Sequence, residues 1–181
     1  MENLWSYWTL PGGAILRPLI ENDADELFAL IDRNRGRLGE YLPWVHSTQA
    51  PADVATFLRS AASQHAAGLG FHAGIEVDGR LAGCAGMHPI DLAHGNVALG
   101  YWIDGAFEGR GLVTQATAEL VRICFAGFGL RRVEIRCAAG NERSRAVPLR
   151  LGFREEGILR AAQNVNGRYL DLHVFGKLST D

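Results

Sequence analysis

The sequence predicts an α/β fold in which helices cover a mixed, mostly antiparallel sheet. Asp78-Gly79 and Asn166-Gly167 each separate two apolar runs, and such pairs favour the tight turn that joins antiparallel strands. A strand, a glycine loop and a helix follow one another over residues 97–125. A strand that reaches its successor through a helix pairs with it in parallel, by a right-handed crossover. Together these three observations predict a sheet that contains both antiparallel and parallel pairs of strands.

The central unit, 97–125, is predicted from two periods of apolar residues. Apolar residues first recur at every second position, as in a strand: they are Val97, Leu99, Tyr101 and Ile103. The second period is helical, and its members are Leu112, Ala116, Leu120, Ile123 and Cys124. Gly109 and Gly111 stand between the two elements. We therefore expect a glycine loop at the N-terminus of a helix.

Such a loop can hold a phosphate group, because the first backbone N–H groups of a helix lack intrahelical partners and the dipole there is positive. Glycines let the oxygens approach the backbone closely. A tight connection explains the same pattern equally well. Thr114 stands where a dinucleotide fingerprint has its third glycine, so a doubly wound nucleotide-binding enzyme is disfavoured.

The remaining elements of the N-terminal half follow from local signals. They are a strand over 15–19, a helix that opens at 21–26, an irregular aromatic segment over 38–44, a helix over 48–67, and strands over 71–77 and 80–87. Pro18 closes the first strand, and Pro43 discourages a continuous helix. Asp53 near the start of the 48–67 helix suits its dipole.

The C-terminal half continues in the same alternating way. Its predicted elements are a strand over 132–137, a helix over 141–151 that stops at Gly152, and strands over 153–159 and 170–175 joined across Asn166-Gly167. Gly129 is a natural residue to follow the end of the preceding helix. The strands between residues 71 and 103 should form an antiparallel meander. The strand over 132–137 should lie parallel to the one before it.

The composition fits one globular domain over residues 1–181, with 48% hydrophobic and 21% charged residues. No apolar run reaches the ~20 residues of a membrane span, so no membrane is expected. The first eight residues lack the basic flank and cleavage site of a signal peptide, which predicts a cytoplasmic protein. Cys84, Cys124 and Cys137 are odd in number and lie in apolar surroundings. Buried thiols are expected there, not disulfides or a metal site.

The charge is unevenly distributed along the chain. The formal net charge of −2 argues against direct binding of nucleic acid. Residues 1–90 carry six arginines against ten acidic residues, whereas residues 91–181 carry twelve basic against ten acidic ones. The glycine loop lies in the basic half, which suits an anionic cofactor. An ordinary solvated surface accounts for the same charges equally well.

Two blocks of residues carry a resemblance that covers nearly the whole chain. The first is Gly100-Tyr101-Trp102-Ile103 with Gly109-Arg110-Gly111 behind it, and the second is Asn141-x-x-Ser144-x-x-Val147-x-x-x-Leu151-Gly152-Phe153 with Glu156-Gly157 behind it. The sequence resembles the GNAT superfamily of acetyl-CoA-dependent N-acetyltransferases, in the branch that acetylates ribosomal-protein N-termini. The resemblance implies acetyl-CoA as co-substrate, no metal, and a splayed parallel pair of central strands. It also implies an amine acceptor, either a protein N-terminus or a small amine, and it allows a homodimer.

The resemblance also implies roles for particular residues. Trp102 and Ile103 would line the pantetheine arm, and the pyrophosphate loop would comprise Glu108, Gly109, Arg110, Gly111, Leu112, Val113 and Thr114. Asn141 would hydrogen-bond the pantetheine arm, although a helix N-cap is its purely structural alternative. Ser144 would be catalytic, donating a hydrogen bond to the departing thiolate. A serine that satisfies local backbone groups is the alternative there.

The general base is the point at which the chain departs from the family pattern. Ala98 stands where relatives often carry glutamate, and Gln163 stands where the ribosomal branch can carry a carboxylate. His72, His88 and Glu156 are the candidates that remain, each also explicable as structural or surface residues.

Without a carboxylate, an amine that is already partly neutral is the simpler substrate. An α-amino group has a pKa of about 7.7–8, against about 10.4 for lysine. Protein N-termini or weakly basic small amines are therefore favoured. A catalytically weak CoA-binding or ligand-sensing domain remains the alternative function.

Overall fold

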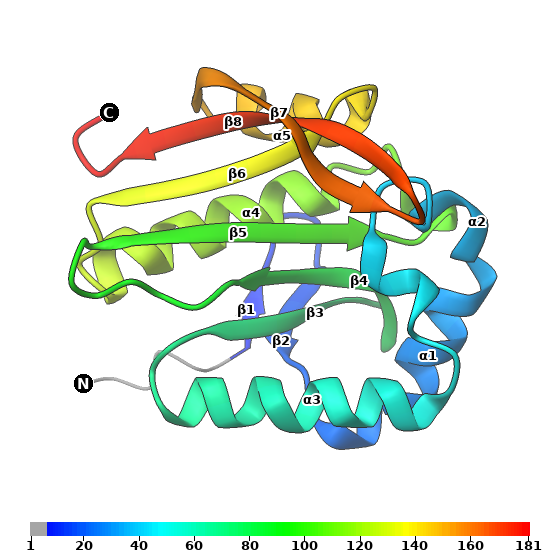
Figure 1. Cartoon of the computed structure of the whole chain (residues 1–181). Helices are drawn as coiled ribbons and strands as arrows, with labels where there is room; N and C mark the ends of the chain where they lie inside the picture. The colour runs from blue at the N-terminus through cyan, green and yellow to red at the C-terminus, as the bar shows by residue number, and fades with distance from the viewer. Residues whose placement is uncertain (1–6) are drawn as a thin grey trace.

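The computed structural model describes residues 7–181, and the expectation drawn from the first eight residues rests mainly on residues outside this range. The described chain forms one sheet of eight strands in the order β1-β2-β3-β4-β5-β6-β8-β7 (Figure 1). The strands are β1 (Trp8–Thr9), β2 (Ile15–Pro18), β3 (Phe71–Val77), β4 (Arg80–Met87), β5 (Asn96–Ile103), β6 (Arg132–Ala138), β7 (Arg154–Val165) and β8 (Arg168–Leu178). Only β5 and β6 pair in parallel within this sheet. The predicted fold class is confirmed.

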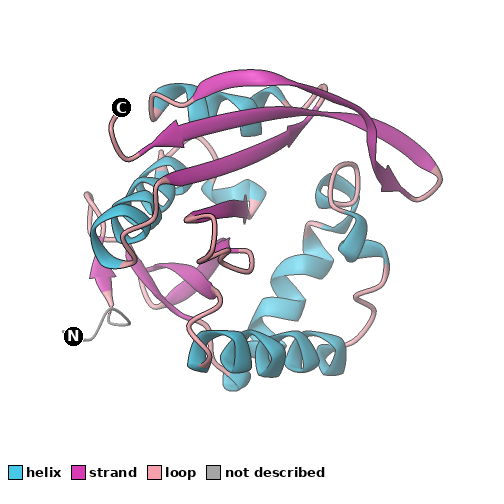
Figure 2. Cartoon of the chain, turned by 60° about the vertical axis from the view of Figure 1, so that its left-hand side comes forward, coloured by secondary structure: helices cyan, strands magenta, loops and turns pink. Residues whose placement is uncertain are grey.

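Helices lie on both sides of the sheet (Figure 2). They are α1 (Ala24–Arg33), α2 (Arg35–Leu38), α3 (Pro51–Ala66), α4 (Leu112–Arg122) and α5 (Glu142–Arg150), with 3₁₀ turns at Glu21–Asp23, Pro43–His46 and Gly105–Phe107 and a π turn at Ile123–Gly127. The predicted 48–67 helix begins at Pro51, because proline suits the first turn, where its missing N–H is not needed. Asp53 then accepts hydrogen bonds from the backbone N–H groups of Gln49 and Ala50 at 2.8 and 2.9 Å.

The two faces of the sheet bury two separate cores. Residues of α4 pack with Val97 and Leu99 of β5 on one face. Residues of α1 and α3 form the core of the other face, with Trp102 packed against it. Since successive side chains of a strand point to opposite faces, β5 contributes to both cores. The alternation predicted for this strand is confirmed.

The two predicted hairpin turns are present. Asp78 and Gly79 have φ angles of 50° and 75°, and Asn166 and Gly167 have φ angles of 50° and 84°. Two consecutive positive φ values are what the tight I′ turn requires. The last hairpin is longer than predicted, because a bulge with Ala161 at φ 50° interrupts the alternation of β7. The short edge strand β1 was not predicted, since two residues give no period.

The strands β5 and β6 separate halfway along their length. Their pairing runs only from Asn96↔Arg132 to Leu99↔Ile135. Beyond that point β5 stays paired with β4 as far as Ile103, and β6 stays paired with β8 as far as Ala138. Each strand follows its outer neighbour, so the sheet opens at its centre. The splayed parallel pair is therefore present.

Asp104, directly after β5, joins the opened strand to α1. It is only 5% exposed and accepts hydrogen bonds from Asn34 Nδ2 at 2.9 Å and Arg33 Nη2 at 2.5 Å. Burial opposes its charge, but these bonds prevail and lower the pKa of the Asp104 carboxyl. The Asn34 amide also donates to the Leu30 carbonyl at 2.8 Å, so losing the carboxylate would leave one of its two buried N–H groups without an acceptor.

Asp104→Ala should therefore lower the free energy of unfolding by about 2–3 kcal/mol, the cost of an unsatisfied buried polar group. Urea unfolding followed by circular dichroism measures this value. Asp32→Ala is the matched control, because it removes an exposed carboxylate that pairs with Arg35, and such surface pairs contribute about 0–1 kcal/mol. Equal losses in the two variants would show that the Asp104 network contributes no special stability.

Candidate functional site

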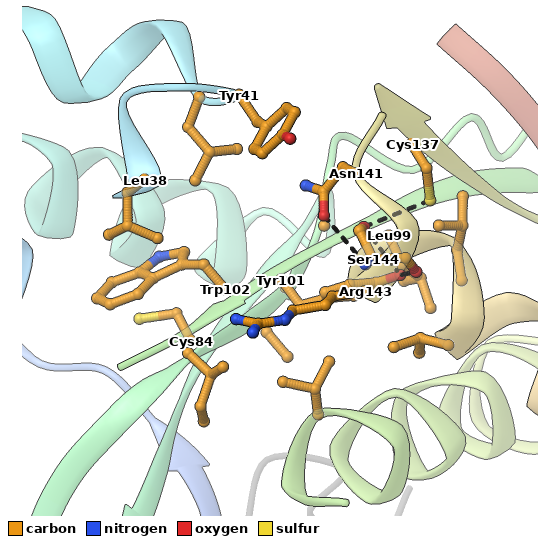
Figure 3. Close-up of a pocket in the computed structure, with 18 of the residues that line it drawn as sticks. Leu38, Tyr41, Cys84, Leu99, Tyr101, Trp102, Cys137, Asn141, Arg143 and Ser144 are labelled. Atoms are coloured by element: carbon orange, nitrogen blue, oxygen red, sulfur yellow. Dashed lines mark hydrogen bonds between the residues drawn. The ribbon is translucent and has the colours of Figure 1, made fainter. Parts of the chain in front are cut away.

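A cavity of about 1910 Å³ opens where β5 and β6 part. It is lined from both faces of the sheet, by Leu38 and Trp102 on one side and by Asn141 and Ser144 on the other (Figure 3). Pockets for one small ligand usually measure about 300–1,000 Å³. The cavity therefore has room for two ligands that meet in the opening of the sheet.

The glycine loop forms one end of the cavity. Gly109 and Gly111 have φ angles of 75° and 74°, a region that side chains disfavour. A Cβ at Gly109 would meet nothing within 4 Å, and one at Gly111 would meet only Gln115 Nε2 at 3.7 Å. Gly111 caps α4, so the first amides of that helix face open space without intrahelical partners. These features fit the binding of a phosphate group.

Charge pairs fix the loop to helices on either side. The Glu108 carboxylate pairs with Arg37 of α2 and with Arg143 of α5. Arg37 also donates to the carbonyl of Ile103, at the end of β5. Arg110 lies outside the cavity lining, with its guanidinium 4.9 Å from the centre of the Phe107 ring.

Asn141 and Ser144 lie at the start of α5, as predicted. Asn141 Oδ1 accepts a hydrogen bond from the Ser144 backbone N–H at 3.1 Å, so the capping interpretation of Asn141 is confirmed. This bond uses the side-chain oxygen and leaves the Nδ2 amide to serve a ligand. Ser144 Oγ lies 3.4 Å from Cys137 Sγ and 3.5 Å from the Tyr101 hydroxyl. The serine hydroxyl thus meets two weak partners at the cavity wall.

Tyr101 and Cys137 are site residues that the sequence interpretation missed. Tyr101 donates to the carbonyl oxygen of Ser144 at 2.9 Å, and it stands between the two groups of lining residues in Figure 3. Burial raises the pKa of the Tyr101 phenol and of the Cys137 thiol. Both groups are therefore neutral at pH 7. In the sequence, Tyr101 and Cys137 could have been recognised because each places a polar atom on the apolar side of a predicted strand.

Trp102 and Ile103 line the cavity from opposite faces of β5. The Trp102 ring lies 6.1 Å from that of Trp44, with the planes inclined at 50°. Ile103 packs against the core that α4 covers. Of the predicted cofactor residues, all except Arg110 lie in the cavity wall.

The candidates for a general base separate into two groups. His72 and His88 line the cavity, whereas Glu156 does not. Ala98 and Gln163, which replace the family carboxylates, also lie in the cavity wall. Glu156 instead pairs through both oxygens with Arg132, at 2.6 and 2.5 Å, and this pair lowers the pKa of its carboxyl. Glu156 is thus occupied by a surface ion pair.

Gln163 donates from its Nε2 to the Tyr41 carbonyl. This bond holds the last hairpin to the segment before α3. Among the described residues no group of histidine, cysteine and carboxylate side chains is arranged to hold a metal ion.

Comparisons with known proteins agree with this geometry. The family described as acetyltransferase (GNAT) domain matches residues 14–154. The chain is 37% identical to "Putative ribosomal N-acetyltransferase YdaF" of Bacillus subtilis over 92% of its length and 91% of that protein. It is 28% identical to the ribosomal-protein-serine acetyltransferase of Escherichia coli over 90% and 91% of the two chains.

A solved structure has the same fold. It is RimL, a ribosomal L7/L12 α-N-protein acetyltransferase in complex with coenzyme A, with a TM-score of 0.91, 25% identity, and coverage of 97% of this chain and 100% of that one. These matches confirm the resemblance inferred from the two sequence blocks. The chain belongs to the acetyltransferase (GNAT) domain family.

Proposed function

We propose that the protein transfers the acetyl group of acetyl-CoA to the α-amine of a protein N-terminus, of the kind found on ribosomal proteins. The observation that carries the proposal is the cavity that crosses the sheet between β5 and β6. It lets a cofactor bound on the α4 and α5 side meet an acceptor on the α1 and α3 side. A small amine is the alternative acceptor, and the cytoplasm is the expected compartment.

The glycine loop would hold the pyrophosphate of acetyl-CoA. Its open amides and the α4 dipole favour negative charge, and no Cβ blocks the approach at Gly109 or Gly111. RimL, which shares the fold, is known with coenzyme A bound. The pantetheine arm would then run along the free edge of β5, past Asn141.

The free edge of β5 supplies hydrogen-bond donors for the thioester. His88 N donates to Ala98 O at 2.9 Å, and Asp104 N donates to Ala82 O at 2.7 Å. The even-numbered residues of β5 therefore bond to β4, and by the alternation of a strand the odd-numbered amides face β6. Tyr101 lies beyond the last paired residue of that side. Its amide is placed to stabilise an oxyanion.

Acetyl transfer then needs only a neutral amine and a stabilised leaving group. The amine nitrogen attacks the thioester carbon, the tetrahedral intermediate collapses, and the C–S bond breaks. Ser144 would donate a hydrogen bond to the departing thiolate and keep its own hydrogen, and water would deliver the proton. Tyr101 and Cys137 keep the hydroxyl in place without introducing a charge.

The acceptor follows from the chemistry of the cavity and from the relatives. The relative in Escherichia coli is named for ribosomal-protein serine, and RimL is named as an α-N-protein acetyltransferase. With Ala98 in place of a carboxylate, α-amines are easier substrates than lysines. No observation favours the weak CoA-binding alternative, and turnover of acetyl-CoA with any amine would exclude it.

A peptide with a free N-terminus should be acetylated faster than the same peptide with a blocked N-terminus and one free lysine. The expected ratio of kcat/KM at pH 7.5 is about tenfold or more, because far less of the lysine is neutral. Thiol release from acetyl-CoA measures both rates. Faster turnover of the lysine peptide would refute the assignment of α-amines as acceptors.

Gly111→Asp should weaken acetyl-CoA binding by more than about tenfold, or ~1.4 kcal/mol, because it adds bulk and negative charge beside the phosphate oxygens. Titration calorimetry measures the affinity. Gly129→Asp is the matched control, since Gly129 also has positive φ and open space but lies beyond the other end of the α4 segment. Unchanged affinity in the Gly111 variant would remove the loop from the site.

Ser144→Ala should lower kcat by about tenfold or more while changing acetyl-CoA affinity little, because its bond strengthens only as the thiolate forms. Steady-state kinetics and calorimetry separate the two effects. Ser63→Ala controls for the loss of a helical serine hydroxyl, since the exposed Ser63 hydroxyl donates to the Arg59 carbonyl within α3, away from the cavity. An intact kcat with a lower Tm would assign Ser144 a structural role.

A further inference from the structure

His88 lies beside the position where the chain lacks a carboxylate. It directly follows β4, and its backbone N–H donates to the carbonyl of Ala98 at 2.9 Å. Two residues earlier, Gly86 pairs with Gly100, so His88 and Ala98 are opposite neighbours on adjacent strands. Their side chains point to the face that α1 and α3 cover, because Met87 and Leu99 point to the other core.

Gly100 makes room for the His88 imidazole at the point where the sheet opens. A Cβ on Gly100 would stand 3.1 Å from His88 Nε2. Gly100 is the first residue of β5 beyond the last pair with β6, Leu99↔Ile135. The ring nitrogen therefore lies over the start of the gap, inside the cavity that we assign to the two substrates.

His72, the second histidine of the cavity, is more closely packed than His88. A Cβ on Gly86 would stand 2.5 Å from His72 Nδ1, and the His72 ring packs edge-on against Phe57 of α3 at 5.0 Å. Burial, with a smaller effect from His88, lowers the pKa of His72 to about 4. His72 thus behaves as a packed, neutral ring.

His88 is exposed to the cavity, in contrast to its half-buried neighbour. The charged groups nearest to it come from β6, where Arg136 lies across the gap and binds Glu134 at 2.6 Å. His72 faces it from β3, and Ala98 and Gly100 of β5 bring no charge. Partial burial, then Arg136, lowers the pKa of His88 below its ordinary value. The imidazole is therefore neutral at pH 7 and able to accept a proton.

We propose that His88 is the general base of this protein, taking the proton from the ammonium form of the acceptor. This inference rests on the proposed function. The step moves one proton from R–NH₃⁺ to His88 Nε2 and leaves a neutral amine, which attacks the thioester. The second proton of the nitrogen leaves as the intermediate collapses and goes, through water, to the thiolate. The His88 imidazolium then releases its proton to the open cavity.

A base with a lowered pKa also selects the acceptor. It can deprotonate an α-ammonium group of pKa about 8 much more readily than a lysine of pKa about 10.4, a difference of about 250-fold in acidity. His88 and the absence of a carboxylate at Ala98 thus favour the same substrates.

The pH profile of kcat/KM for a peptide α-amine tests the proposal, with His88→Gln as the variant. The wild type should be level between about pH 7 and 8, because burial and Arg136 lower the pKa of His88 and the ammonium is the bound form. His88→Gln can use only the neutral amine. Its kcat/KM should rise tenfold per pH unit and level near 8, so that at pH 6.5 it lies about 30-fold below its own plateau.

His72→Gln is the matched control, since it removes the neighbouring cavity histidine and should leave the level profile unchanged. Acetyl-CoA affinity, measured by calorimetry, should be the same in all three proteins. A wild-type profile that already rises to pH 8 would overturn the role of His88, whether or not the variant folds. Absence of turnover with every peptide and small amine would instead overturn the proposed function.

Discussion

The separation of β5 from β6 is the constraint on which the rest of the structure depends. Parallel pairing ends at Leu99↔Ile135 because each strand remains paired with its outer neighbour. Unpaired backbone groups are costly when buried, so an open seam persists only where a ligand or solvent can satisfy them. The seam thus explains why a cavity of about 1910 Å³ crosses the sheet between its two hydrophobic cores. In the proposed function, it also lets the cofactor and the acceptor approach from opposite faces.

The two sides of the seam have different electrostatic character. On the α5 side, Tyr101, Cys137 and Ser144 form a neutral group, because burial raises the pKa of the phenol and the thiol. On the α3 side, His88 meets the solvent of the cavity with Arg136 nearby. A neutral surface suits the uncharged thioester and pantetheine, whereas proton transfer from the amine needs a titratable group. In the proposed mechanism, the neutral groups therefore face the thioester and the titratable group faces the amine.

Sequence patterns predicted the elements whose signal is local. The alternation in β5, the I′ turns at Asp78-Gly79 and Asn166-Gly167, and the cap at Asn141 depend on neighbouring residues alone. The bulge at Ala161 could not be predicted, because it depends on a bond from its N–H to Asp171 across the hairpin. The two sequence motifs predicted most of the residues that line the cavity, but they did not predict the contacts between them. Glu108 is an example. By pairing with Arg37 of α2 and with Arg143 of α5, the Glu108 carboxylate links two helices that are about a hundred residues apart in sequence.

The general base shows the same limit most clearly. A family pattern assigns a role to one position, so Ala98 seemed to leave the protein without a base. In a sheet, however, the space above one residue can be filled from the adjacent strand, since opposite Cβ atoms lie only about 4.5–5.5 Å apart. In our proposal, His88 makes this substitution, with Gly100 leaving space for its ring. A base is therefore better identified by the space it occupies at the opening of the sheet than by its position along the strand.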